Sequence, residues 1–394
     1  MVLTAKQEEG LRIAVERHRN GEKYTVISGY AGTGKSTLVR FIIAALNVDE
    51  DRVCYATFTG KAAEVLRKKG NKNATTMHKL LYDFVPRRGG GFFRKPKPTI
   101  NYDIIVIDEV SMAPKEMMDL LFKHNVYVIC LGDPFQIPPI DKDADNHLLD
   151  NPHIFLDEIM RQAQESEIVR LSMNIREMKP IELFKGANVQ VVGRNQFIPG
   201  MLTWADQVIV ATNNKRHQLN TQMRQMLGFS GPPQTGDKII CLHNYWNEAS
   251  AYGDALVNGT IGYLAAPEEL TITLPAAARC SVPSIQVYSA AMTTGEDDIY
   301  EDLMMDKNML INGEPTLDWR DNYSLGRLAA RYGDLIPKQF SYGYAITGHK
   351  AQGSEWDKVL VIEESFPFDK MEHARWLYTC VTRAADKLVL VRNN

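Results

Sequence analysis

Short apolar runs alternate with helical stretches through the first half of the chain, and the same alternation returns later. The predicted strands are 24–28, 52–57, 103–108 and 126–133, followed by 188–192, 207–211, 358–362 and 387–391. The predicted helices are 36–46, 60–69, 114–123, 214–227 and 372–382. Nearly continuous apolar strands between helices are typical of a parallel sheet that helices cover on both faces. The pattern therefore predicts an α/β protein with two such cores.

Two segments interrupt the alternation. Residues 81–100 contain three consecutive glycines between basic and aromatic side chains, which predicts an exposed β-hairpin. Residues 239–336 contain strand-like stretches such as TITL and IQVY beside an acidic run, which predicts a small β-rich insertion. The first core then comprises 1–80 and 101–178, and the second comprises 179–238 and 337–394.

Composition narrows the class of protein only slightly. The chain has 394 residues, of which 44% are hydrophobic and 24% charged, as in ordinary globular proteins. No apolar run reaches about 18 residues, which excludes a transmembrane helix, and the N-terminal residues lack the apolar region of a secretory signal. Five scattered cysteines favour free thiols in a reducing compartment, so we expect a cytoplasmic protein. The net charge of −3 does not indicate a nucleic-acid partner, which local features would have to hold.

The strongest chemical signal is a phosphate-binding loop. Residues 29–36 read GYAGTGKS, which fits G-x-x-x-x-G-K-[ST], and they lie between a predicted strand and a predicted helix. The glycines let backbone N–H groups face phosphate oxygens, and the helix N-terminus adds positive potential. Lys35 would reach the β- and γ-phosphates, while Ser36 would ligate Mg²⁺. The loop predicts ATP as a ligand.

Two acids and a glutamine follow neighbouring predicted strands of the first core. Asp108 and Glu109 end the run IIVI, and Gln136 lies just past the strand 126–133. Carboxyl ends of parallel strands meet at the edge of the sheet where ligands bind. Asp108 would hold Mg²⁺, Glu109 would orient the attacking water, and Gln136 would sense the γ-phosphate.

Phosphoryl transfer also needs positive charge at the γ-phosphate in the transition state. Arg161 in LDEIMRQ and Arg383 in YTCVTRA are the two candidates. Composition alone favours an ordinary surface salt bridge for each. The motifs around them change that interpretation.

Eight segments occur in a specific order: GYAGTGKST, TFTGKAA, TTMH, VIDEVSM, GDPFQIPP, LDEIMRQ, ITGHKAQGSEW and YTCVTRA. This ordered set resembles the superfamily 1 helicases, in the RecD/Dda-type branch that moves 5′→3′. The resemblance extends from about Leu3 to Val391. It implies two RecA-like P-loop motor domains, with a β-hairpin inserted in the first and an SH3-like insertion in the second. Asn258 and Gly259, in LVNGTIG, resemble the start of that second insertion.

The resemblance also implies roles for individual residues. Gln7 would read adenine, Asp108 and Glu109 would form the magnesium and water-activating pair, and Gln136 would be the sensor. Arg161 and Arg383 would be the two arginine fingers. The remaining nucleotide-binding positions would be Gly32, Thr33, Gly34, Lys35, Ser36, Thr37 and Gly353, and those lining a single-strand groove would be Thr59, His78, Thr347 and His349.

Three positions depart from the usual family pattern. Phe58 stands where proline is commoner, Gly348 replaces a β-branched residue, and Ala351 replaces serine. All three fall in segments that face DNA or couple it to the nucleotide site. Phe58 would stack on a base or, alternatively, serve as a core aromatic at a strand end.

A motor mechanism follows as a hypothesis. ATP would sit between the two cores, and single-stranded DNA lying across both would be gripped alternately as the cleft closes and opens. Phe92 or Phe93 in the 81–100 hairpin would cap the last base pair at a single-strand/duplex junction. The alternative is a basic loop without a wedge role.

The sequence thus predicts an ATP-dependent DNA helicase that acts in replication or repair. We expect it to use Mg²⁺, to work as a monomer without a membrane, and to meet single-strand-binding or replication proteins. A bacterial cell or phage-infected host is the expected setting. The alternatives are a DNA-stimulated translocase with little unwinding, a P-loop kinase, and a nucleotide-gated binding module. The direction of movement rests on the resemblance alone.

Overall fold

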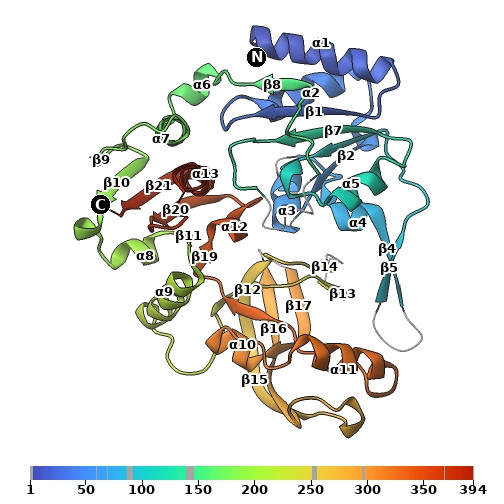
Figure 1. Ribbon diagram of the computed structural model, residues 1–394, viewed down its shortest axis with the longest axis vertical. Coiled ribbons are helices and arrows are strands. Elements are labelled where there is room, and N and C mark those ends of the chain that lie inside the picture. The colour runs from blue at the N-terminus through green and yellow to red at the C-terminus, as the bar shows by residue number, and fades with distance from the viewer. Residues whose placement is uncertain are drawn as a thin grey trace. The chain divides into compact units, whose positions relative to one another are not determined.

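The computed structural model describes residues 3–58, 60–68, 70–86, 92–138, 146–250, 255–294, 298–367 and 369–393. These residues form two compact units (Figure 1). Unit 1 contains Met1–Leu81, Lys97–Thr212 and Thr347–Asn394, and unit 2 contains Tyr82–Pro96 and Asn213–Ile346. Among the described residues, no helix has the length and apolar character needed to cross a bilayer. All five cysteines are unpaired.

The first sheet of unit 1 has the strand order β3-β2-β6-β7-β1-β8, and every neighbouring pair is parallel. Its strands are β1 (Tyr24–Gly29), β2 (Val53–Thr57), β3 (Thr75–Thr76), β6 (Ile104–Ile107), β7 (Tyr127–Gly132) and β8 (Ile154–Leu156). Its helices are α1 (Ala5–Arg19), α2 (Lys35–Leu46), α3 (Gly60–Lys68), α4 (Met77–Leu81) and α5 (Lys115–Leu121), with the 3-10 turn η2 (Val110–Met112). Ile27, Leu38 and Ile129 belong to its buried core.

The second sheet has the order β19-β11-β20-β21-β10-β9. Its strands are β9 (Phe184–Lys185), β10 (Val189–Gly193), β11 (Gln207–Val210), β19 (Ala345–Thr347), β20 (Trp356–Ile362) and β21 (Ala384–Arg392). The pairs β11–β20, β20–β21 and β10–β21 are parallel, and β9 is antiparallel to β10. The accompanying helices are α6 (Arg161–Gln164), α7 (Glu167–Arg176), α8 (Gly200–Trp204), α12 (Gly348–Ala351) and α13 (Lys370–Val381). The predicted α/β class with two parallel-sheet cores is confirmed.

Unit 2 is built on an antiparallel sheet of order β17-β16-β15-β12-β18. Its strands are β12 (Lys238–Cys241), β15 (Ile261–Thr273), β16 (Ser284–Thr294), β17 (Asp298–Asp306) and β18 (Phe340–Tyr342), beside the pair β13 (Tyr245–Ala249) and β14 (Ala255–Leu256). Its helices are α9 (Asn213–Met226), α10 (Lys307–Asn312) and α11 (Trp319–Tyr332). The SH3-like character of this region and the domain boundaries stay predictions.

A buried charge cluster ties α9 to the sheet of unit 2. The Arg224 guanidinium donates from Nε and Nη2 to the two carboxylate oxygens of Asp237, at 2.7 and 2.8 Å. The Tyr344 hydroxyl donates to the same carboxylate at 2.8 Å. Asp237 is completely buried, so these partners replace the hydrogen bonds that water would give it.

Strands β4 (Tyr82–Pro86) and β5 (Phe92–Pro96) pair antiparallel, with Val85 opposite Phe93 and Pro86 opposite Phe92. The Arg94 guanidinium lies 5.5 Å from the centre of the Tyr82 ring. Residues 87–91, and the side chains of Phe92 and Phe93, lie outside the described part of the structure. The wedge role therefore stays a prediction.

Candidate nucleotide site

The phosphate loop connects β1 to α2 and depends on glycine geometry. Gly32 and Gly34 have φ angles of 79° and 78°, a left-handed conformation that glycine adopts without steric cost. A Cβ on Gly34 would also lie 2.5 Å from Nε2 of Gln7 and 2.6 Å from Sδ of Met160. No side chain caps the N-terminus of α2, so its first-turn amides are available to an anion, and Ser36 is exposed in that turn.

Lys35 is held over the phosphate loop by backbone carbonyl groups. Its Nζ donates to the oxygens of Gly29 and Tyr30, at 2.6 and 3.1 Å. The buried Thr33 closes the same turn by donating its hydroxyl to the Tyr30 oxygen at 2.8 Å. Thr37 follows, half-buried, in the first turn of α2. The loop thus fixes the ammonium group at the end of the helix where anions are favoured.

Gln7 anchors the start of α1 to this loop. Its side chain and that of Thr4 form a capping box, and the buried Gln7 Nε2 donates to the Thr33 oxygen at 3.1 Å. Met160 donates its amide to the Gly32 oxygen at 2.9 Å. Arg161, the first residue of α6, therefore follows a residue that is bonded to the loop. The side chain of Arg161 lies outside the described part of the structure.

Asp108 and Glu109 follow β6, as the sequence predicts. Glu109 has φ 55° and ψ 51°, a left-handed conformation that is rare outside glycine and is often found at functional sites. Its amide donates to Oδ1 of Asp108 at 3.0 Å. Burial, and then the neighbouring Glu109 carboxylate, raise the pKa of Asp108, whereas Lys35 opposes that shift. A bound cation would offset this unfavourable environment for the Asp108 charge.

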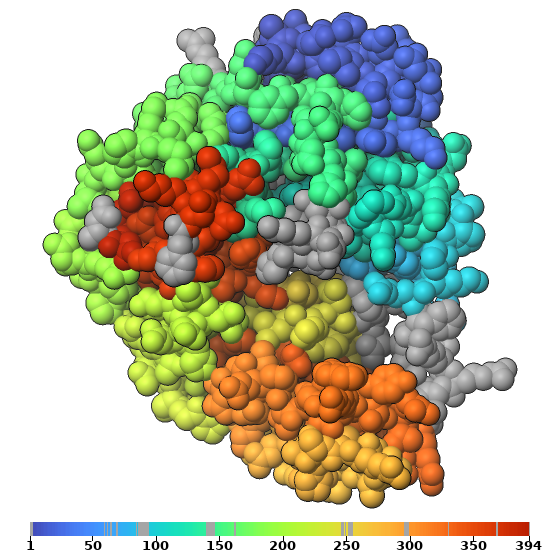
Figure 2. Space-filling model, in the orientation of Figure 1, coloured from blue at the N-terminus to red at the C-terminus, as the bar shows by residue number. Residues whose placement is uncertain are grey.

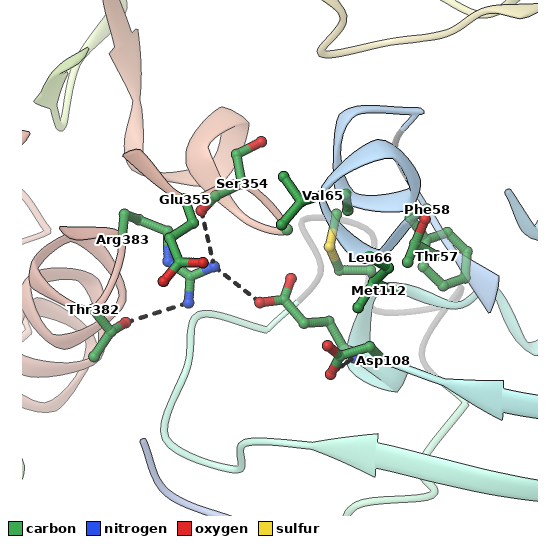
Figure 3. Close-up of a pocket in the computed structure, with 13 residues that line it drawn as sticks. Thr57, Phe58, Val65, Leu66, Asp108, Met112, Ser354, Glu355, Thr382 and Arg383 are labelled. Atoms are coloured by element: carbon green, nitrogen blue, oxygen red, sulfur yellow. Dashed lines mark hydrogen bonds and ion pairs between the residues drawn. The ribbon is translucent and has the colours of Figure 1, made fainter. Parts of the chain in front are cut away.

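Arg383 forms a buried ion pair with Glu109. Its Nη1 lies 2.9 Å from Oε1 of Glu109, and the two side chains are only 8% and 19% exposed. Arg383 follows α13 of the second core, and its Nε also donates to the Thr379 oxygen at 3.1 Å. Burial alone would lower the pKa of Arg383, but the attraction and hydrogen bond of Glu109, together with Asp133 and Cys380, raise it overall. The second core therefore places a cation on Glu109 of the first (Figure 3).

A pocket of about 230 Å³ opens beside this ion pair (Figure 3). One side is apolar and comes from α3, η2 and the end of β2, while the other contains Asp108, Glu109 and Arg383. Phe58 lies on the apolar side. The lining residues are Thr57, Phe58, Ala62, Val65, Leu66, Asp108, Glu109, Met112, Gly353, Ser354, Glu355, Thr382 and Arg383.

Tyr378 on α13 makes a second connection between the cores. Its buried hydroxyl accepts the Ala31 amide of the phosphate loop at 2.8 Å and donates to Oδ2 of Asp133 at 2.6 Å. Burial, and then Asp133, raise the pKa of Tyr378 far above its ordinary value, so the hydroxyl stays a donor. Sequence reasoning missed this residue, although it lies in the quoted motif YTCVTRA, because a tyrosine in an apolar helix is ordinarily a core residue.

The loop after β7 is tied to the second core at Ile137. The Ile137 amide donates to Oγ1 of Thr379 at 2.9 Å, and its oxygen accepts Nε2 of Gln352 at 2.7 Å. Gln136 lies beside it, half-buried, and its side chain forms no hydrogen bond within the described part of the chain. The sensor candidate is thus next to the residue that both Gln352 and Thr379 hold.

The predicted groove residues are distributed over several elements of unit 1. Thr347 is the residue just before α12, His349 is half-buried on that helix, and His78 is half-buried on α4. Burial lowers the pKa of His349. Thr59 lies outside the described residues, so the structure neither joins it to the others nor separates it from them.

The glycine that replaces a β-branched residue has a packing explanation. A Cβ on Gly348 would lie 2.6 Å from Nε1 of Trp376 and 2.9 Å from Sγ of Cys380. Both side chains are buried on α13. Glycine therefore lets α12 approach α13 closely.

Comparison with known proteins agrees with this arrangement. The family described as "AAA domain" matches residues 2–198, and the one described as "UvrD-like helicase C-terminal domain" matches residues 342–391. The ATP-dependent RecD2 DNA helicase of Deinococcus radiodurans is 25% identical over 93% of this chain and 46% of its own length. The chain belongs to the superfamily 1 helicases of the RecD/Pif1 branch.

Other relatives and one solved structure show how far the similarity extends. An uncharacterized protein of Acanthamoeba polyphaga mimivirus, R530, is 24% identical over 94% of this chain and 96% of its own length. The ATP-dependent DNA helicase dda of phage T4 is 30% identical over 35% of this chain and 33% of its own. The chain thus spans less than half the length of both RecD2 and dda. Among solved structures, Pif1 helicase from Candida albicans has a TM-score of 0.48 and 16% identity, covering all of this chain and 95% of that one.

Proposed function

We propose that this helicase hydrolyses ATP between its two cores and uses the cycle to move 5′→3′ along single-stranded DNA and separate duplex strands. The observation that supports this most directly is the buried pair of Arg383 and Glu109. An arginine that pairs with Glu109 from the other core makes hydrolysis depend on how the two cores meet. The RecD2 and dda relatives, which are named as DNA helicases, support DNA as the track.

The first core would bind the nucleotide. Lys35 and the first-turn amides of α2 would hold the phosphates, and Gln7 would contact the adenine after exchanging one of its present hydrogen bonds. The hydroxyl of Ser36 and the carboxylate of Asp108 are hard oxygen ligands of the kind that Mg²⁺ prefers. A magnesium ion bound there would neutralise phosphate charge. The phosphate loop would be completed by Gly32, Thr33, Gly34 and Thr37. Gly353 would be contributed by the second core.

Glu109 would orient the attacking water. Its Oε1 is held by Arg383, whereas its buried Oε2 has no hydrogen-bond partner within the described chain. A buried carboxylate oxygen without a donor is costly, so Oε2 is suited to accept a proton-bearing ligand such as water. When the γ-phosphate is present, Arg383 would extend from Glu109 to the transferring group, and Arg161 would supply a second positive charge.

The nucleotide site would be coupled to the DNA-binding groove through Ile137. Gln136 would sense the γ-phosphate, and the hydrogen bonds of Ile137 to Gln352 and Thr379 would carry its movement to the second core. Single-stranded DNA would lie against Phe58 and the groove residues Thr59, His78, Thr347 and His349. Phe92 and Phe93 would act at the junction with the duplex.

The experiment that tests the function measures phosphate release with and without oligonucleotide, and strand separation on duplexes with a 5′ or a 3′ single-stranded tail. We expect oligonucleotide to stimulate hydrolysis and only the 5′-tailed duplex to open. Turnover that is independent of DNA would contradict the motor and favour a P-loop kinase or other small-molecule ATPase. Opening of the 3′-tailed duplex alone would contradict the direction and leave the helicase assignment intact.

A further inference from the structure

Helix α11 of unit 2 presents two aromatic rings to solvent. Trp319 is 73% exposed and Tyr323 is 65% exposed, one helical turn apart. Single exposed aromatics are ordinary on a protein surface, but large neighbouring ones at helical spacing form a defined patch. Figure 2 shows residues 319–332, in orange, on the face in view.

Three arginines share this side of the helix. Arg320, Arg327 and Arg331 are exposed, and with the two aromatics they fall within about 120° of the helix circumference at 100° per residue. The Arg320 guanidinium lies 5.4 Å from the centre of the Trp319 ring. We call these five residues, Trp319, Arg320, Tyr323, Arg327 and Arg331, the α11 stripe. It extends about 18 Å, the length of roughly five nucleotides at 3.4 Å each.

The acids of the same helix are occupied elsewhere. The Asp318 carboxylate caps the helix by accepting the amides of Arg320 and Asp321, at 2.7 and 2.9 Å. The buried Asp321 accepts the amide and hydroxyl of Ser281. Within the described part of unit 2, none of the stripe arginines forms an ion pair. The stripe therefore has local positive charge on a chain whose net charge is −3.

The geometry points to single-stranded nucleic acid as the ligand of the α11 stripe. Guanidinium groups bind phosphates, and exposed indole and phenol rings stack on unpaired bases irrespective of sequence. In a duplex the bases are already stacked, so the two rings would gain little there. The inference rests on the proposed function, which supplies the single strand, and adds a contact from unit 2 to those proposed for unit 1.

The opposite side of α11 explains why the stripe is free to bind. Leu325 is buried in a cluster with Leu317, Val287 and Ile285, and Leu328 packs against it. The helix is thus fixed to unit 2 by one face, and substitutions in the stripe leave that packing unchanged. Loss of binding in such variants would report the surface and not the fold.

The test compares Trp319→Ala/Tyr323→Ala with wild type on oligo-dT of about 8 and about 25 nucleotides, by fluorescence anisotropy. A short strand fills one site, whereas a long one has length to reach a second. Since stacking contributes about 5-fold to 150-fold in affinity per base, we expect at least a 5-fold weaker Kd on the long strand and no change on the short one. Trp319→Phe/Tyr323→Phe should retain most of the affinity. Tyr263→Ala, which removes another exposed tyrosine of unit 2, is the matched control and should bind like wild type.

The arginines give an independent readout. Replacing all three with glutamine should reduce the slope of log affinity against log salt by about 2 on the long strand, at about 0.7 per phosphate. Equal affinities of wild type and both variants on long and short strands would overturn the proposal. A protein would then be the favoured partner of the α11 stripe. If the variants lose the same affinity for the short and the long strand, the α11 stripe is not a separate binding site. If wild-type hydrolysis is not stimulated by any oligonucleotide, the proposed function fails first, and the binding comparison still decides whether the stripe holds a strand.

Discussion

Removing one hydroxyl tests the connection between the two cores most directly. Tyr378→Phe keeps the ring, which meets Phe135 edge-on at 5.2 Å between centroids, and removes both hydrogen bonds of the hydroxyl. The Ala31 amide and the Asp133 carboxylate then each lose a partner. Asp133 keeps the hydrogen bond from the Phe135 amide to its Oδ1, at 3.0 Å.

The expected cost follows from the two bonds. The bond to the Ala31 amide involves neutral groups and contributes about 0.5–1.5 kcal/mol, and the one to the Asp133 carboxylate about 1.5–3 kcal/mol. Together they predict a loss of about 2–4.5 kcal/mol in the stability of unit 1. For a unit of this size that corresponds to a thermal midpoint lower by roughly 4–18 °C. Because Ala31 belongs to the phosphate loop, we also expect kcat for DNA-stimulated hydrolysis to fall at least about tenfold, which is about 1.4 kcal/mol in the barrier.

The assay needs a control that loses a similar bond elsewhere. Tyr344→Phe removes the hydroxyl that donates to the buried Asp237 in unit 2. We expect it to lower stability by about 1.5–3 kcal/mol and to leave kcat within about twofold. Thermal unfolding is followed with and without a non-hydrolysable ATP analogue, because the transition that the analogue raises belongs to the nucleotide-binding unit.

Two results would refute this reasoning. If Tyr378→Phe unfolds at the wild-type temperature, the two hydrogen bonds contribute no net stability. If its kcat falls no more than that of Tyr344→Phe, the bridge stabilises the cores without affecting the phosphate loop.

Four further changes have defined outcomes. Arg383→Ala should retain binding of a fluorescent ATP analogue and lose about 10³-fold or more of the phosphate-release rate, and wild-type turnover would contradict the role of the ion pair. Phe92→Ala/Phe93→Ala should keep DNA-stimulated hydrolysis and impair strand separation, so unchanged unwinding of a tailed duplex would remove the wedge. Burial lowers the pKa of His349 below its unfolded value of about 6.5. The neutral ring therefore costs the folded state no stability above about pH 6.5, and the protein loses stability as the pH falls below that value. His349→Asn should therefore lose less stability than wild type when urea unfolding is compared at about pH 7 and pH 5, and equal losses would show that this histidine is not responsible. Gly348→Val should lower the thermal midpoint, because overpacking against Trp376 costs about 1–3 kcal/mol of stability. An unchanged midpoint would mean that α13 shifts to accommodate valine without loss of stability.

Local pattern was enough to predict both cores and to nominate most residues of the candidate nucleotide site. The loop 29–36 and the acids after β6 are consecutive in sequence and depend on nearby glycine, strand and helix signals. Tyr378 was missed because its partner Asp133 is 245 residues away, and no local signal distinguishes a bridging hydroxyl from a core one. The left-handed backbone of Glu109 was equally hidden, since its residue type does not require it. The α11 stripe was missed because its helix lies in a region where the alternation suggested strands.

The way the second sheet is assembled has a consequence for how the chain folds during synthesis. Strand β11 pairs with β20, and Asp206 beside it accepts the Lys358 amide across 152 residues of sequence. At a ribosomal rate of about 5–20 residues per second, β11 waits roughly 8–30 s for that partner. Residues 213–346, the larger part of unit 2, are made in this interval, so we expect them to fold while the second core still lacks β20 and β21. We expect nascent chains arrested just before β20 to show a protease-resistant unit 2 and a protease-sensitive β9–β11 segment.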